Sequence, residues 1–217
     1  MNFINNIIID NKSNQNTLKS KILFSGVGVH NGRAVTVCIE PAPIDTGIVF
    51  KRTDICNNNE INAVIDNVVN SSLCTKIANA EGVSVSTIEH IMAAFSALDL
   101  DNVLVKINAP ELPALDGSSD EYIKKFLKVG IKSQDKNRKF LKIMRKVEVR
   151  DGNRFISILP SNELSINVSI NYPNTIIGFS EYFYQHSKDN FIKNLSTART
   201  YTLSEDIEKM RTAGLAI

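Results

Sequence analysis

Residues 86–107 read STIEHIMAAFSALDLDNVLVKI, and this stretch decides the fold class. Its first part carries apolar residues at helical spacing, which predicts a helix over residues 87–98: Ile88, Met92, Phe95 and Leu98. The β-branched run at 103–107 follows at once and predicts a strand. A helix and a strand in direct succession indicate a sheet that is covered by helices.

Outward from this stretch, one order of elements occurs twice. Before it we predict strands at 21–25, 34–40, 47–52, 61–65 and 73–77. After it we predict a helix at 119–128, strands at 142–150, 154–159 and 163–172, and helices at 188–195 and 204–213. The repetition predicts an α+β protein with two similar domains, each a sheet covered by helices on one face. The second pass has no obvious closing strand, so we expect the second domain to be incomplete.

The same pattern predicts where the domains begin and end. We expect domain I over 17–129 and domain II over 142–217, after a loose, Asn-rich N-terminal extension at 1–16. The segment 130–141 reads as a basic linker, because 121–150 holds eleven Lys/Arg against three Asp/Glu. Such a charge run is usually a solvated face, and contact with an anionic substrate or a membrane surface is the weaker alternative.

Composition excludes several classes of protein. With 43% hydrophobic and 22% charged residues in 217, the chain is neither wholly disordered nor collagen-like. The formal charge of +2 argues against nucleic-acid binding by bulk electrostatics. No apolar run approaches the roughly 20 residues of a transmembrane helix. The three cysteines show no CxxC spacing, which favours reduced thiols and a cytoplasmic protein.

The residues with the clearest chemical potential are Glu89 and His90, at the start of the predicted 87–98 helix. Neither belongs to the apolar stripe of that helix. A metal-ligand imidazole beside a carboxylate base is an arrangement used to activate water. It is not the HExxH motif, because Ile91 and Ala94 occupy the places of its Glu and second His. Without other information, an isolated histidine is more often structural than a metal ligand.

Two further histidines lie elsewhere. His30 belongs to a turn with three glycines, at 25–32, that predicts close backbone approach. As a phosphate loop this turn is weak, because no Lys-Ser/Thr pair follows. His186 reads as a surface loop residue.

Six motifs stand in order along the chain: Ser25–Gly32, Leu73–Thr75, Ser86–His90, Asn108–Pro113, Leu115–Ser118 and Ala198–Tyr201. Together they resemble the UDP-3-O-acyl-N-acetylglucosamine deacetylases, the zinc hydrolases of early lipid A synthesis in Gram-negative bacteria. The resemblance covers residues 17–217. It implies two α+β domains with the active site between them, a UDP-sugar acyl substrate and a monomeric enzyme.

The resemblance also implies roles for single residues. Zinc is held in this family by two histidines and an aspartate, and His90 matches the first histidine. Glu89 matches the general base that takes a proton from zinc-bound water. Thr200 matches a residue that hydrogen-bonds the oxygen of the attacked carbonyl. Without the family Thr200 would be unremarkable.

Three more residues are assigned to the surroundings of the substrate by the same resemblance. Tyr201 occupies an aromatic position, Cys74 a thiol position near the metal, and His30 a loop close to the site. A small buried hydrophobe is the commoner role for a residue like Cys74. Asp116 is a helix-capping residue more often than a catalytic acid.

The match stops before the site is complete. The remaining zinc ligands of the family lie in a His-Lys-x-x-Asp motif, with the acid histidine later still, and no histidine follows His186. We therefore expect a C-terminally truncated deacetylase that is inactive as these 217 residues alone. The alternative is a non-catalytic module that binds a sugar nucleotide or an acyl chain.

Overall fold

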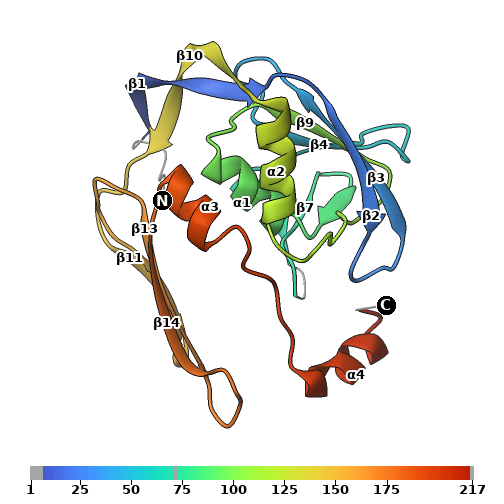
Figure 1. Ribbon diagram of the computed structural model, residues 1–217, viewed down its shortest axis with the longest axis vertical. Helices are drawn as coiled ribbons and strands as arrows, with labels where there is room; N and C mark the ends of the chain where they lie inside the picture. Colours follow the sequence, from blue (N-terminus) through green and yellow to red (C-terminus); the bar gives the residue numbers. More distant parts are fainter. Residues whose placement is uncertain (1–6, 71–72, 216–217) are drawn as a thin grey trace. The chain divides into compact units, whose positions relative to one another are not determined.

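The computed structural model describes residues 7–70 and 73–215 (Figure 1). Its helices and several sheets confirm the α+β class. The chain divides into two compact units, and each is described by itself. One unit comprises 15–136 with the described part of 191–217, and the other comprises 137–190 with the described part of 1–14.

A five-stranded sheet with the order β2-β3-β9-β4-β5 is the centre of the unit that contains 15–136. Its strands are β2 (Ile22–Val27), β3 (Ala34–Pro41), β4 (Ile48–Arg52), β5 (Glu60–Asn62) and β9 (Val103–Ile107). Strand β9 pairs antiparallel with β3 and parallel with β4. Side chains of β3 alternate between buried and accessible, so the sheet has one apolar face.

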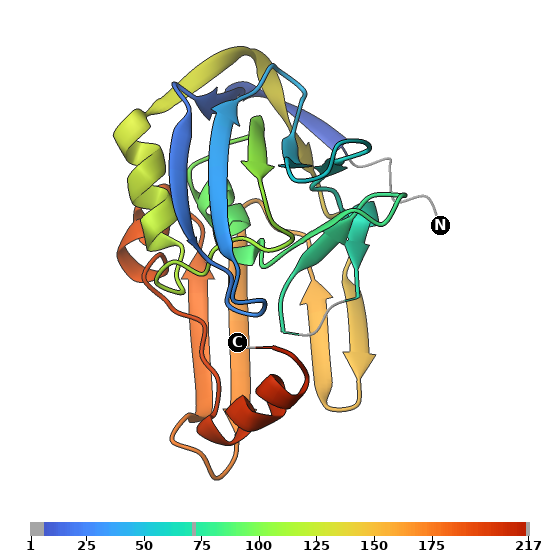
Figure 2. The same cartoon turned by 90° about the vertical axis from the view of Figure 1, so that its right-hand side faces the viewer.

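Helices α1 (Glu89–Ala97) and α2 (Asp120–Val129) pack against this apolar face (Figure 1, Figure 2). The rings of Phe95 and Phe126 stack between the two helices with their centroids 5.0 Å apart. Tyr122 of α2 meets Phe24 of β2 edge to face at 5.8 Å. The predicted helices and the strand at 103–107 are thus present where the periodicity placed them.

A small three-stranded sheet leads into α1. It consists of β6 (Val68–Val69), β7 (Lys76–Ala78) and β8 (Ser84–Ser86), and a single 3-10 turn at Ile65–Asn67 precedes it. Two residues separate the end of β8 from the start of α1, and Ser86 forms a parallel bridge with Glu111. This sheet therefore positions the start of α1.

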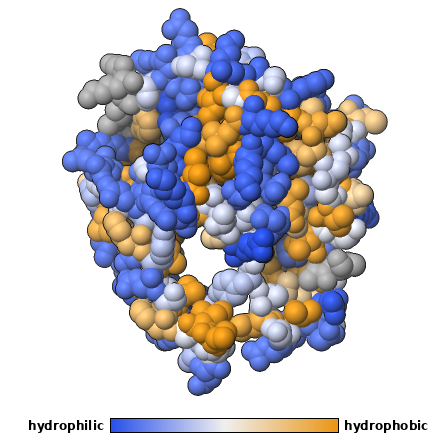
Figure 3. All heavy atoms as spheres, in the orientation of Figure 1, coloured by the Kyte–Doolittle hydropathy of each residue, from blue (hydrophilic) through white to orange (hydrophobic). Residues whose placement is uncertain are grey.

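The unit that contains 137–190 includes two hairpins. Strand β11 (Val147–Asp151) pairs with β12 (Arg154–Ile158), and β13 (Ser165–Tyr172) pairs with β14 (Gly178–Gln185). Many apolar side chains of the hairpins are exposed, among them Phe155 at 59% and Phe183 at 63%. Figure 3 colours such apolar side chains orange where they reach the surface.

Two long strands lie in segments for which the sequence predicted an irregular extension and a linker. Strand β1 (Ile7–Leu18) pairs with β10 (Ile131–Leu141), so residues 7–16 of the predicted extension and 131–141 of the predicted linker are not irregular. Each polar strand supplies the backbone partners that the other needs. Residues 1–6 of the predicted extension lie outside the described residues. The division between the two units falls within both strands.

Two further helices follow the hairpins: α3 (Lys188–Asn194) and α4 (Ser204–Thr212). Because 191–215 belongs to the same compact unit as 15–136, the units do not coincide with the ranges 17–129 and 142–217, and those domain boundaries stay a prediction. Over 7–70 and 73–215, no helix is both long and apolar enough to span a membrane.

Candidate active site

Glu89 opens helix α1 and is tied to a neighbouring loop. Its Oε2 accepts a hydrogen bond from the backbone amide of Thr75 at 2.9 Å. In return, the amide of Ile88 donates to the carbonyl oxygen of Thr75 at 3.3 Å. A carboxylate at this position also benefits from the positive end of the helix dipole. The loop that carries Cys74 is therefore fixed beside Glu89.

His90 and Glu89 are both half-buried, whereas Ile91, Ala94 and Phe95 of the same helix are buried in the core. The polar pair therefore stands at the margin of the apolar stripe, as the sequence predicted. Burial, helped by the negative charge of Glu89, raises the pKa of Tyr122 well above its ordinary value of about 10. Its hydroxyl donates to the carbonyl oxygen of Pro113 at 3.0 Å, so this phenol stays neutral and serves packing.

The backbone corner before α1 is strained. Thr87 has φ of +59°, in the left-handed region that a β-branched residue rarely adopts. The amide of Ser86 donates to Pro110 O at 2.9 Å, and that of Leu112 donates to Ser86 O at 3.1 Å. These hydrogen bonds to residues 110–112 hold the backbone beside Thr87 in place and so maintain its strained conformation.

His30 lies in the turn between β2 and β3. Its backbone amide donates to Glu111 Oε1 at 2.9 Å, and the amide of Asn31 donates to Glu111 Oε2 at 2.9 Å. The ring Nδ1 of His30 is buried and has no hydrogen-bond partner among the described residues. A Cβ at Gly28 would stand 2.6 Å from both Glu111 Oε2 and Asn31 Oδ1, so a side chain there would have to displace these groups.

Thr200 and Tyr201 lie between α3 and α4. The amide of Thr200 donates to Gly117 O at 3.0 Å, and the amide of Ser119 donates to Ser196 O at 3.0 Å. These bonds attach the segment to the start of α2. The side chains of Thr200 and Tyr201 remain exposed. Among the described residues, no hydrogen bond or ion pair joins Thr200 to Glu89 or to His90.

Asp116 strengthens this attachment. Its Oδ1 accepts bonds from the amide and hydroxyl of Ser118, and Arg199 approaches its Oδ2 at 3.6 Å. Burial alone would raise the pKa of Asp116, but the Ser118 hydrogen bonds and the Arg199 charge together hold it below its usual value. The hydroxyl of Ser118 in turn accepts a bond from the amide of Asp120 at 3.1 Å. Asp116 therefore braces the turn before α2 through Ser118. It is not the helix cap itself, because the N-cap of α2 is Ser119, whose side chain makes no capping hydrogen bond.

A hollow of about 350 Å³ brings the loop before Cys74 together with α4. Its lining is mostly apolar: Leu73, Thr202, Asp206, Lys209, Met210, Ala213 and Leu215. Leu73 precedes Cys74 and Thr202 follows Tyr201, so two of the predicted substrate residues have neighbours in the wall of this hollow.

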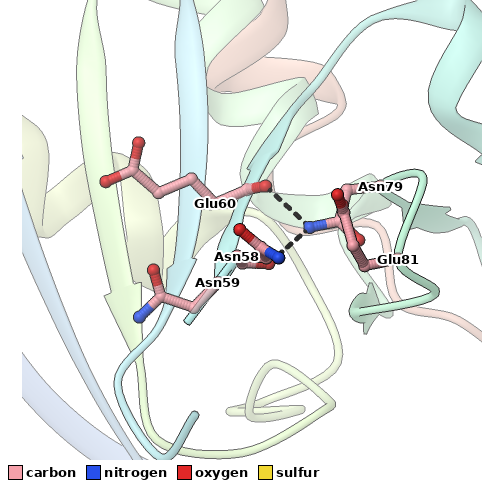
Figure 4. A pocket seen from close by; sticks show the side chains of 5 residues that line it. All are labelled: Asn58, Asn59, Glu60, Asn79 and Glu81. Carbon is pink, nitrogen blue, oxygen red and sulfur yellow. Dashed lines mark hydrogen bonds between the residues drawn. The ribbon is translucent and has the colours of Figure 1, made fainter. Parts of the chain in front are cut away.

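A second hollow, of about 360 Å³, has a different character (Figure 4). Its walls are polar: Asn58, Asn59, Glu60, Asn79 and Glu81. The side-chain amide of Asn79 donates to the carbonyl oxygens of Asn58 at 2.6 Å and Glu60 at 3.1 Å. These bonds hold two loops together, and none of the predicted site residues lines this hollow.

The donor set for a metal is incomplete in the described residues. His90 is one imidazole donor, but no group of three or more His, Cys, Asp or Glu side chains is arranged there to hold a metal ion. A catalytic zinc takes about three protein ligands. The residues present in 7–70 and 73–215 therefore do not by themselves fit a catalytic zinc.

Sequence reasoning missed the supporting residues of the site. Glu111 stood inside a quoted motif without a role, and Thr75, Thr87 and Gly117 were not singled out for one. The available signal was Glu111 itself, an acid in the otherwise uncharged run 107–115.

Comparison with known proteins agrees with the motifs. The LpxC family model, UDP-3-O-acyl N-acetylglycosamine deacetylase, matches residues 15–217. The UDP-3-O-acyl-N-acetylglucosamine deacetylase of Mannheimia succiniciproducens is 39% identical over 205 residues, covering 94% of this chain and 67% of the relative. Those of Actinobacillus succinogenes and Haemophilus ducreyi are each 38% identical with the same coverage. The chain therefore belongs to the UDP-3-O-acyl-N-acetylglucosamine deacetylase family.

Proposed function

We propose that this chain carries the base-bearing part of a deacetylase that removes the N-acetyl group from UDP-3-O-acyl-N-acetylglucosamine, early in lipid A synthesis. Family membership supports the substrate. The observation that carries the assignment in this chain is the anchored carboxylate of Glu89 beside His90, at the start of α1.

The proposed chemistry follows from what the side chains can do. Glu89 holds one oxygen on the Thr75 amide and keeps the other for a water molecule, from which it takes a proton. Thr200 has an exposed side chain whose hydroxyl donates to the oxygen of the attacked amide carbonyl. Tyr201, Cys74 and His30 border the substrate.

Zinc is the proposed cofactor, and it would act as a Lewis acid on the water and the carbonyl. His90 is the one residue that we assign to it. A stable site needs donors from outside these 217 residues, so we propose that the isolated chain has no turnover. Stoichiometric zinc together with deacetylation by the isolated chain would contradict this.

The direct test measures release of acetate from the UDP-sugar, with and without added zinc, and the zinc content of the purified chain. Glu89→Gln is the matched control, because it keeps the size of the side chain and removes the base. The DNA downstream of codon 217 supplies a second test. An in-frame His-Lys-x-x-Asp would supply the missing donors.

A non-catalytic module that binds a sugar nucleotide or an acyl chain is the second candidate. The largely apolar hollow beside Leu73 and α4 favours it. Calorimetry with the UDP-sugar separates the two candidates, because the module should bind its ligand without zinc. For either function we propose a monomer in the cytoplasm.

A further inference from the structure

Glu111 is a buried carboxylate, 1% exposed, that the proposed chemistry does not use. It accepts three hydrogen bonds: from the amide of His30 at 2.9 Å, the amide of Asn31 at 2.9 Å and the hydroxyl of Thr87 at 3.2 Å. All three partners are donors, which suits an ionised carboxylate, an acceptor only. Within 7–70 and 73–215, no lysine or arginine pairs with it.

Each donor belongs to a segment that carries a proposed site residue. Two amides come from the turn of His30. The hydroxyl comes from Thr87, in the strained corner just before Glu89 and His90. The buried Nδ1 of His30 has no hydrogen-bond partner among the described residues. The position of the imidazole ring therefore depends on the backbone hydrogen bonds of the turn.

The residues around Glu111 leave space for its carboxylate and orient it. Gly28 leaves the space that a Cβ would take from Glu111 Oε2. The bridge between Ser86 and Glu111 aligns the carboxylate with the corner. Three segments far apart in the sequence thus meet at one buried group, and two of them present site residues.

We propose that Glu111 is a positioning residue, which holds the His30 turn and the Glu89–His90 corner in one arrangement. The functional meaning of this role rests on the proposed deacetylase function. Glu111 itself is too buried to touch a substrate.

The test uses the imidazole signals of the three histidines, recorded by NMR on the 217-residue chain without metal or substrate. Thr87→Val removes one donor and should move the His90 signals beyond their line width. Gly28→Ala pushes against the carboxylate and should move the His30 signals. Glu111→Gln keeps one acceptor oxygen but replaces the other with an amide donor, which then faces one or two of the three donors, so this variant should move both sets of signals. Thr87→Ser, which keeps the hydroxyl, should restore the His90 signals.

Two controls separate positioning from general stability. His186 lies in the other compact unit and should keep its signals in every variant. Asp54→Asn breaks an ion pair with Arg52 in the same unit as Glu111, and it should lower the melting temperature without moving His30 or His90.

The proposal is overturned if a folded Glu111→Gln chain keeps the His30 and His90 signals in place. If that variant does not fold, Thr87→Val and Gly28→Ala test the proposal instead. Unchanged His90 signals in Thr87→Val would show that Glu111 does not hold the Glu89–His90 corner. Unchanged His30 signals in Gly28→Ala would show that it does not hold the His30 turn. The signals need no turnover. A chain without deacetylase activity can therefore still be used to test the role of Glu111. A negative result for Glu111 does not contradict the proposed deacetylase function.

Discussion

The carboxylate of Glu89 and the backbone amide of Thr75 are joined by a hydrogen bond of 2.9 Å. One oxygen is thereby committed to the loop of Cys74, and the other accepts no hydrogen bond from the described residues. The bond fixes the direction of the side chain before any substrate arrives. This relationship leads to the first prediction.

Glu89→Gln should leave the fold intact, because the amide oxygen of glutamine can still accept the bond from Thr75. Glu89→Ala loses that bond and should lower the free energy of unfolding by about 1 kcal/mol. In any form of the protein that turns over the UDP-sugar, Glu89→Gln should reduce kcat by roughly 10²–10⁴-fold. Urea unfolding and acetate release measure the two effects. Full activity of the glutamine variant would exclude Glu89 as the base.

Tyr122 should make the fold sensitive to alkaline pH. Its pKa is raised in the folded chain, whereas an unfolded tyrosine ionises near pH 10, so above about pH 10 the unfolded state binds fewer protons. Stability should therefore fall as the pH rises, by up to about 1.4 kcal/mol per pH unit from this group. Tyr122→Phe should remove this contribution. Unfolding at pH 8 and pH 11 tests it, and equal pH slopes in the two chains would contradict it.

Asp116 should control the attachment of the Thr200 segment. Its lowered pKa means that its stabilising effect is present above the ordinary carboxyl pKa of about 4 and is lost as the pH falls through the folded value. Asp116→Asn should therefore speed hydrogen exchange of the Thr200 amide at neutral pH. Arg199→Gln is the matched variant with a smaller effect, since Arg199 is 3.6 Å away and largely exposed. If the hydrogen-exchange rate of the Thr200 amide were unchanged in Asp116→Asn, Asp116 would not control the attachment of this segment.

Phe95 should be critical for stability, because its ring is 1% exposed and stacks on Phe126. Phe95→Ala should cost about 3–5 kcal/mol of unfolding free energy. Phe155→Ala is the control, since that ring is 59% exposed and its loss should cost less than about 1 kcal/mol. Urea denaturation compares them. Similar losses at both positions would contradict the burial seen here.

Local pattern predicted the elements whose signal is contiguous. The helical spacing before Leu98 and the β-branched run at 103–107 became α1 and β9. The pattern did not predict strands β6, β8 and β14, and it predicted irregular chain where β1 and β10 lie. Those two are polar, and they are strands because they pair with each other across a long sequence separation.

By itself the sequence determined the helices and strands that have a contiguous pattern and the adjacency of Glu89 and His90, because periodicity and covalent neighbours are local properties. Only the tertiary structure decided which groups support them. The bonds that His30 and Thr87 donate to Glu111 span 81 and 24 positions in the chain, and the bond that Thr75 donates to Glu89 spans 14. Such bonds depend on how the sheet and helices bring distant segments together, which no local pattern encodes.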